Sequence, residues 1–140
     1  MTDEARRLSV EFQLQAGEQA LRAAEALQTL GLTLDALSRL YFAALHFMKA
    51  LLAWAGIEAK SHRGVHSLVG LHFVAQGKLE PALQQTFSRL ETWRDKADYQ
   101  EGFVGDPALL AREIQACLQL RDRVLLALQE SGYRTGASKP

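Results

Sequence analysis

Three short strings along the chain combine cationic, aromatic and hydrogen-bonding side chains. Residues 38–46 read SRLYFAALH, residues 62–65 read HRGV, and residues 94–99 read RDKADY. Each string lies in or beside a segment that is otherwise strongly apolar. A guanidinium on an apolar surface is costly unless an anion or a partner chain meets it. These strings are therefore where we expect functional chemistry.

Arg94 is the first candidate. When residues 80–99 are projected as a helix at about 100° per residue, Arg94 falls in the middle of the apolar side and Asp98 follows one turn later at its edge. One interpretation is an intrahelical ion pair between the two, worth about 0.3 kcal/mol if exposed. The other is that Arg94 faces a cleft or a two-fold interface and holds a phosphate, which suits its planar fork of donors. The projection leaves both open.

The histidine pair His62 and His66 has the i,i+4 spacing with which a helix can hold one metal ion. No carboxylate or third histidine stands at matching spacing, and we expect His62 to precede the helix. We therefore predict no metal site. Instead of binding a metal ion, His62 and Arg63 are expected to cap or cross a turn, and His72 is expected to pack against the core.

Arg39 and His46 fall on the same face of the second expected helix, two turns or about 10 Å apart. That separation is large for joint action on one phosphodiester, because a general acid or base must come within about 3 Å of its proton. We prefer a solvated or interfacial face at these positions. The sequence contains no glycine-rich phosphate-binding loop and no Gly-x-Ser-x-Gly nucleophile elbow. It also lacks the Glu-x-x-His pairs of di-iron helical bundles.

The bulk composition fits one globular domain of 140 residues. Sixteen basic and 16 acidic residues balance to a formal net charge of zero, so the chain lacks the basic excess typical of nucleic-acid binders. Cys117 is the single cysteine and falls among apolar residues, which predicts a packed core thiol. We place the domain over residues 1–132 and a disordered tail over residues 133–140.

Helical periodicity dominates the sequence and predicts an all-α fold, an up-and-down four-helix bundle with an extra short helix. Gly31, Gly77 and Gly132 are expected to end helices, Thr33 to cap the second and Asp106 to cap the last. A polar turn is expected over residues 58–64 and a loop over residues 100–105. The predicted helices are 3–30, 33–56, 65–76, 80–99 and 107–131.

The second predicted helix is apolar nearly all round. Such a helix must be covered on more than one side, either as the central helix of the bundle or by a second subunit. His46 and Lys49 interrupt its most apolar run, 40–57, which falls short of a convincing membrane span. The charged N-terminus does not resemble a signal peptide. We expect a cytoplasmic protein with no membrane contact.

In order and spacing, the three strings resemble the HEPN domain family of small helical bundles. The resemblance covers about residues 17–128. The first string, with residues 49–52, resembles the second helix of HEPN proteins, the second string resembles the turn before their third helix, and the third resembles the signature that closes the fourth.

The resemblance implies a homodimer and, for many members, a minimal nucleotidyltransferase as partner in toxin–antitoxin pairs. It also implies that the signature arginine lies near the two-fold cleft. We expect an interface and a phosphate-binding site there for a nucleotide or RNA. The candidate binding residues are Arg94, Asp98, Tyr99, His62 and Arg63, and the candidate interface residues are Arg39, Phe42 and His46.

Catalytic HEPN members are metal-independent ribonucleases in which an arginine is followed after four to six residues by a histidine. Here Tyr99, Gln100 and Glu101 occupy those positions. Tyrosine is a poor base at neutral pH because its pKa is near 10. The chain thus resembles a branch of the family that keeps Arg-x-x-Ala-Asp-Tyr and lacks an established activity.

Three functions are weighed for this sequence. We favour a dimeric binding or interaction module, without cofactor or metal, that works with a nucleotidyltransferase. The alternatives are a ribonuclease toxin, using Arg94 with Tyr99 or a histidine brought in by folding, and an unrelated metal- or ligand-binding bundle. Enzymatic activity is left open, with the missing histidine arguing against it.

Overall fold

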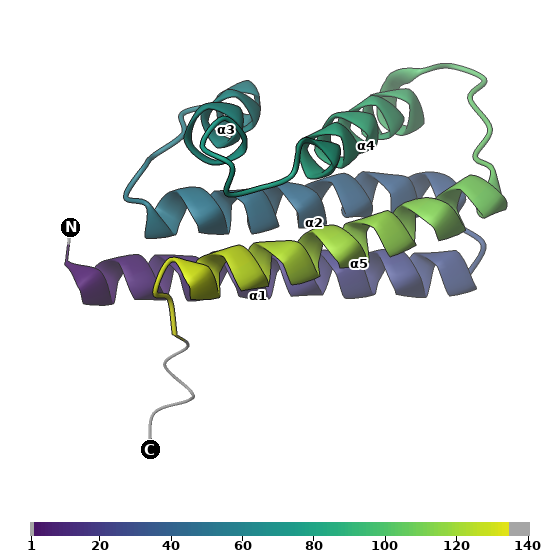
Figure 1. Cartoon of the computed structure of the whole chain (residues 1–140). Helices are drawn as coiled ribbons and strands as arrows, with labels where there is room; N and C mark the ends of the chain where they lie inside the picture. The colour runs from purple at the N-terminus through teal and green to yellow at the C-terminus, as the bar shows by residue number, and fades with distance from the viewer. Residues whose placement is uncertain (1, 135–140) are drawn as a thin grey trace.

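The structure is a computed structural model, and it describes residues 2–134 of the chain. Helices account for nearly all of this part, and it contains no strand, which confirms the predicted all-α class (Figure 1). The elements are α1 (Asp3–Thr29), α2 (Thr33–Trp54), α3 (His62–Val69), a π-helical turn η1 (Gly70–Val74), α4 (Pro81–Tyr99) and α5 (Pro107–Glu130).

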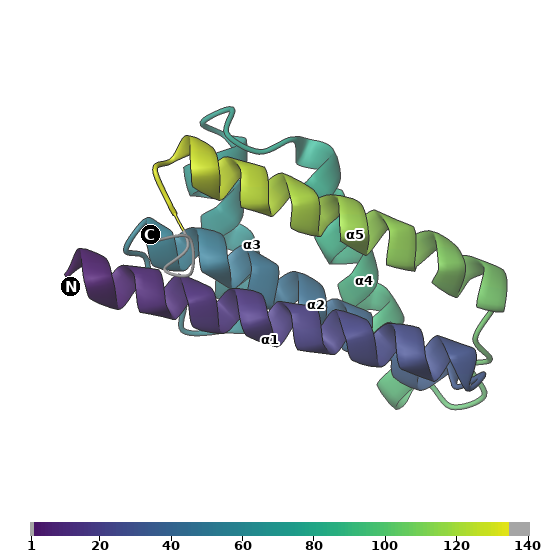
Figure 2. The same cartoon turned by 90° about the horizontal axis from the view of Figure 1, so that it is seen from below.

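The helices are arranged around α2. In Figure 1, α1, α2 and α5 lie lengthwise beside one another, while α3 and α4 lie on the opposite side of α2. Figure 2 shows α4 running at a marked angle to α2. The helix α2 contacts each of the other four, and its contact with α1 is the most extensive. The crossing of α4 over α2 is what brings the first and third sequence strings together.

The apolar character of α2 is explained within one chain. Twelve of its 22 residues are buried, on several sides of the helix. It is long and apolar enough to cross a membrane by length and composition, but 67% of the relevant window is buried inside the protein, as expected of a core helix. Of the two alternatives for α2, the central position is therefore confirmed, and its apolarity requires no second subunit.

Most helix ends follow the signals in the sequence. Asp106 accepts a hydrogen bond from the amide of Ala108, so its predicted capping role is confirmed. Gly31 has a φ of 75°, a left-handed conformation that suits glycine at a helix end. The capping role predicted for Thr33 is wrong, because α2 starts one residue earlier than a Thr33 cap requires: the carbonyl of Leu32 already accepts from the amide of Ala36 at 3.0 Å.

The start of α3 differs from the prediction. Ser61 accepts a hydrogen bond from the amide of Gly64 at 3.0 Å and caps a helix that begins at His62. The predicted turn over 58–64 and helix over 65–76 are therefore wrong at their shared boundary. The expected packing of His72 is also wrong, since the π-helical turn alters the register and leaves this side chain exposed.

The two remaining predictions about packing concern Cys117 and the tail. Cys117 is fully buried, which confirms the core thiol, and burial raises its pKa to about 12. Tyr133 lies in the predicted tail, yet it is buried and packs edge-on against Trp54 at 5.4 Å between ring centroids. Residues 135–140 of that predicted tail lie outside the described residues.

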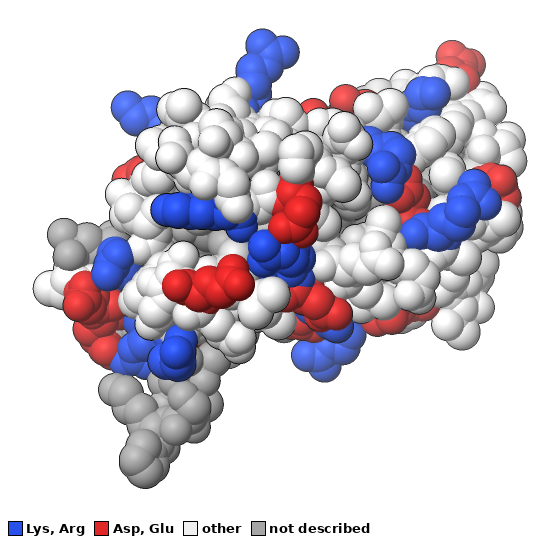
Figure 3. All heavy atoms as spheres, viewed as in Figure 1, with Lys and Arg blue, Asp and Glu red and all other residues white. Residues whose placement is uncertain are grey.

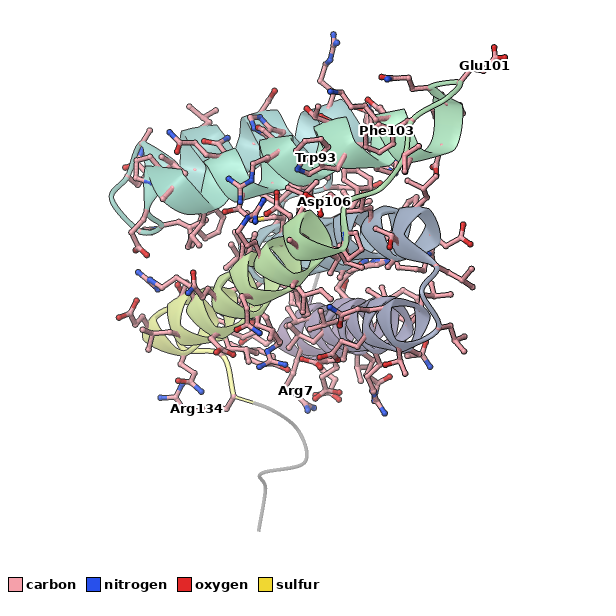
Figure 4. All side chains as sticks on the ribbon, turned by 90° about the vertical axis from the view of Figure 1, so that its right-hand side faces the viewer. Arg7, Trp93, Glu101, Phe103, Asp106 and Arg134 are labelled. Carbon is pink, nitrogen blue, oxygen red and sulfur yellow. The ribbon has the colours of Figure 1, made fainter. Side chains whose placement is uncertain are left out.

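A buried carboxylate joins α4 to α5. Glu113 is 3% exposed and accepts two hydrogen bonds from Arg89, at 2.7 and 2.8 Å, and one from Trp93 Nε1 at 2.8 Å. Phe103 stacks on Trp93 with 6.3 Å between centroids, and Figure 4 shows the two rings together above Asp106, where α5 begins. This clamp fixes the face of α4 that points away from the candidate site.

Candidate functional site

Arg94 lies where α4 crosses α2. Its guanidinium carbon is 4.9 Å from the ring centroid of Tyr41, 5.6 Å from that of Phe42 and 5.9 Å from that of Tyr99. The side chain is only 19% exposed. A cation over aromatic faces gains from the ring quadrupole, and more so when partly desolvated. The structure thus brings together strings that stand more than fifty residues apart.

The carboxylates around Arg94 engage it incompletely. Its Nη2 donates to Asp95 Oδ1 at 3.1 Å, while its Nε lies 4.0 Å from Asp98 Oδ2, beyond hydrogen-bond length. Asp98 instead accepts from the Ser38 hydroxyl of α2 at 3.3 Å. The Arg94 Nε is buried and has no hydrogen-bond partner among the described residues. The intrahelical pair of the first interpretation is present as an ion pair at 4.0 Å, and one donor of Arg94 has no partner among the described residues.

The electrostatics keep Arg94 charged. Burial lowers its pKa, but the hydrogen bond from Arg94 to Asp95 and the nearby Asp95, Tyr41 and Tyr99 side chains raise it by more, so the net shift is upward. A permanent positive charge, held on rings and shielded from bulk water, is suited to binding an oxyanion.

Tyr41 belongs to this site, although it is not among the binding residues predicted from the sequence. Its ring stacks on Phe87 at 5.8 Å and is fully buried, and its hydroxyl has no hydrogen-bond partner among the described residues. Burial raises its pKa to about 12. The signal that could have identified it is a tyrosine in an otherwise aliphatic stripe, because a buried phenol usually has a partner.

His62 joins the same group from α3. Its ring is 5.9 Å from that of Tyr41 and 6.2 Å from that of Phe42. Arg63, the next residue, is exposed and makes no hydrogen bond or ion pair within residues 2–134. We call the assembled group the Arg94 cluster; it consists of Ser38, Tyr41, Phe42, His62, Arg94, Asp98 and Tyr99.

The three residues predicted at an interface line one groove between α1 and α2, of about 380 Å³. Arg39 lies over the Phe42 ring at 4.8 Å. His46 Nδ1 is 2.8 Å from Gln13 Oε1. Burial first, then the charges of Lys49 and Arg39, lowers the pKa of His46. Phe42 is the member shared with the Arg94 cluster, so the groove and the cluster are continuous.

The cluster offers cationic, aromatic and hydroxyl groups, which suit binding of a phosphate with an attached ring. A metal centre has no support in it: residues 2–134 contain no group of three histidine, cysteine, aspartate or glutamate side chains that could hold an ion. A histidine does lie in the cluster, but it comes from α3 and not from the position after Arg94.

Comparison with known proteins matches residues 10–131 to a family model described as "HEPN domain". The chain is 34% identical over 93 residues to "Putative toxin MJ0605" of Methanocaldococcus jannaschii, covering 66% of this chain and 69% of that protein. It is 39% identical over 71 residues to "UPF0332 protein PH1297" of Pyrococcus horikoshii, covering 51% and 50%. It is 34% identical over 82 residues to "UPF0332 protein glr0978" of Gloeobacter violaceus, covering 59% and 65%.

Proposed function

The chain belongs to the HEPN domain family, and we propose that it is a dimeric binding module in which Arg94 binds the phosphate of a nucleotide or RNA. We further propose that it works in the cytoplasm beside a minimal nucleotidyltransferase, as in a toxin–antitoxin pair. The name of one relative, "Putative toxin MJ0605", supports this class. The antiparallel α1 and α2, with α5 running back along α1, support an up-and-down HEPN bundle (Figure 1).

The single observation that carries the binding proposal is the state of Arg94. It is a cation of 19% side-chain exposure that lies over two rings of α2, and its Nε has no hydrogen-bond partner within residues 2–134. A buried donor without a partner costs about 1–3 kcal/mol, and a phosphate oxygen that reached Nε after a shift of the Arg94 side chain would relieve that cost. The face drawn in Figure 3 intersperses basic and acidic side chains, which favours one local anion site over a long nucleic-acid track.

The dimer proposal rests on what is uncovered beside that cation. Tyr99, whose ring lies 5.9 Å from the Arg94 guanidinium, is 76% exposed, and Phe42 is half-buried at the edge of the cluster. A second copy placed over the crossing of α2 and α4 would cover these groups. The same copy would close the open side of the Arg94 cluster.

The binding test compares Arg94→Gln with Arg112→Gln, which removes an exposed arginine of α5. We expect the wild type to bind a short RNA or a mononucleotide, measured by calorimetry. Loss of a charge-assisted bond should weaken binding by about tenfold or more in Arg94→Gln and leave the Arg112 variant unchanged. Equal affinities for the two variants would remove the proposed site.

The dimer test uses Phe42→Asp against Leu126→Asp, an exposed leucine of α5. Sedimentation at micromolar concentration should show a dimer that Phe42→Asp dissociates more than it unfolds, while Leu126→Asp remains dimeric. A monomeric wild type would refute the dimer. Co-purification with the product of the adjacent gene then tests the nucleotidyltransferase partner.

A ribonuclease is the second candidate, and the position of His62 favours it. Folding brings this imidazole to rings that also contact Arg94, so a general base could approach a phosphate held there. We expect no cleavage of RNA at neutral pH by the isolated protein. Cleavage that both His62→Gln and Arg94→Gln abolish would instead establish the ribonuclease.

A further inference from the structure

A separate pocket lies at the end of the molecule where α2 finishes. It has a volume of about 440 Å³, within the range of small-molecule sites. Trp54 in its wall is 13 residues along α2 from Tyr41, or about 20 Å. The pocket is therefore distinct from the Arg94 cluster. Its lining comes from α1, α2, η1, the turn after η1 and the end of α5.

The ionisable side chains that line this pocket, among the described residues, are all basic. Arg6 of α1, His72 of η1 and Lys78 of the following turn contribute to it, and no aspartate or glutamate within residues 2–134 lines it. Asp3 pairs with Arg6 at 2.8 Å, but its side chain is 91% exposed and does not line the pocket. Convergent basic side chains without a lining carboxylate favour an anionic group inside.

The basic groups stand beside apolar walls. The Arg6 guanidinium lies 4.4 Å from the ring centroid of Trp54 and donates to the Trp54 carbonyl at 2.5 Å. The indole is fixed in turn, because its Nε1 donates to the carbonyl of Ser131 at 2.9 Å. Leu51 and Phe73 complete an apolar surface next to the cations. A flat apolar body would pack on this surface while its anionic end meets the basic side chains.

The backbone provides an independent indication. The π-helical turn η1 supplies two lining residues, with Phe73 buried and His72 exposed toward the pocket rim. Turns of this kind are rare and occur frequently at functional sites. Regular α-helical geometry would continue the α3 register, in which the two side chains were expected to pack on one side. The irregular turn is therefore what makes the imidazole available at the pocket.

We propose that this pocket binds a small organic anion, with a phosphate or carboxylate group on a flat apolar body. The anionic group lies between Lys78, His72 and the free edge of Arg6, and the apolar body packs on Trp54. The site is independent of the Arg94 cluster and of any RNA bound there.

The probes are phenyl phosphate and benzoate, with benzyl alcohol as the neutral comparison. The protein is labelled with 5-fluorotryptophan and followed by ¹⁹F NMR. The chain has two tryptophans, Trp54 in the pocket and Trp93 in the α4–α5 clamp, so the second resonance reports the fold and serves as an internal control. We expect the anions to shift only the Trp54 resonance, with dissociation constants of about 1 mM or below.

Substitutions of Lys78 test the role of its positive charge and leave the apolar wall of the pocket unchanged. Lys78→Gln should weaken binding by about fivefold, and Lys78→Arg should retain it. Lys60→Gln, which removes an exposed lysine outside the pocket, and Arg94→Gln should both bind as the wild type does. Arg6 is not substituted, because it donates a hydrogen bond to the Trp54 carbonyl and its loss would also affect the pocket wall.

The outcomes separate cleanly. Tighter binding of phenyl phosphate assigns a phosphate ligand, and tighter binding of benzoate assigns a carboxylate. A Trp54 resonance that does not move at 10 mM probe, about ten times the expected constant, overturns the proposal. Equal binding of benzyl alcohol, or a Lys78→Gln variant that binds like Lys60→Gln, overturns it as well.

Discussion

The buried clamp between α4 and α5 gives the most quantitative prediction. We consider Glu113→Gln, which keeps the shape of the side chain and removes its charge. The native carboxylate accepts three hydrogen bonds, two from Arg89 and one from Trp93. A glutamine has one acceptor oxygen, and its amide nitrogen would face donors. At least one bond is therefore lost and another loses its ionic character.

The magnitude follows from the unequal burial of the two partners. Glu113 is 3% exposed, whereas the Arg89 side chain is 44% exposed and can be hydrated when its partner is neutral. Exposed ion pairs contribute about 0–1 kcal/mol, and breaking a fully buried pair costs about 3–5 kcal/mol. We expect Glu113→Gln to lower the free energy of unfolding by about 2 kcal/mol. Arg89→Met should cost more, because it strands a buried carboxylate.

Chemical denaturation by urea, followed by circular dichroism, measures these changes. The corresponding fall in melting temperature is about 8 °C for Glu113→Gln. Glu101→Gln is the matched control, since Figure 4 shows Glu101 projecting from the loop after α4, and it should change stability by less than about 0.5 kcal/mol. If Glu113→Gln were as stable as Glu101→Gln, or Arg89→Met cost less than Glu113→Gln, the reasoning would be refuted.

Three further predictions concern α2 and its contacts. Because burial lowers the pKa of His46, the unfolded chain binds more protons below about pH 6.5, so stability falls as the pH drops; His46→Gln should flatten that fall in acid denaturation curves. In Gly17→Ala the new Cβ would stand 2.7 Å from the buried Phe47 ring, which should cost about 1–3 kcal/mol in urea unfolding. Ser38→Ala should free Asp98 to close on Arg94 and weaken nucleotide binding by up to about fivefold in calorimetry.

The extent of the helices could be predicted because their signals are local. Gly31 ends α1 through its own backbone conformation, and Asp106 with Pro107 starts α5 by capping and by its fixed φ. The burial of α2 could likewise be predicted from its own apolar residues, without knowing which helices pack against it. The start of α3 was missed because Ser61, a good cap, stands before histidine, arginine and glycine instead of an apolar run.

What periodicity could not predict depends on contacts between helices. Glu113 falls on the inward stripe of α5 with no local sign that Arg89 and Trp93 of α4 would meet it. The π-helical turn has no sequence signature, so the prediction that His72 packs assumed a regular helix. These features arise only once α4 is placed against α5 and α3 against the end of α2.

The geometry of the Arg94 cluster also depends on contacts between helices, which periodicity could not predict. A helical projection places Asp98 one turn from Arg94 and leaves open whether the two side chains form a closed pair. In the fold, the Ser38 hydroxyl of α2 bonds to Asp98, and the rings of α2 lie against the face of the guanidinium, so the pair stands at 4.0 Å. The crossing of α4 over α2 thereby holds the positive charge in place, while its Nε finds no hydrogen-bond partner in the part of the chain that the structure describes. A closed bidentate pair with Asp98 would occupy two of the five N–H donors of Arg94 and neutralise its charge, and would thereby weaken its attraction for a phosphate.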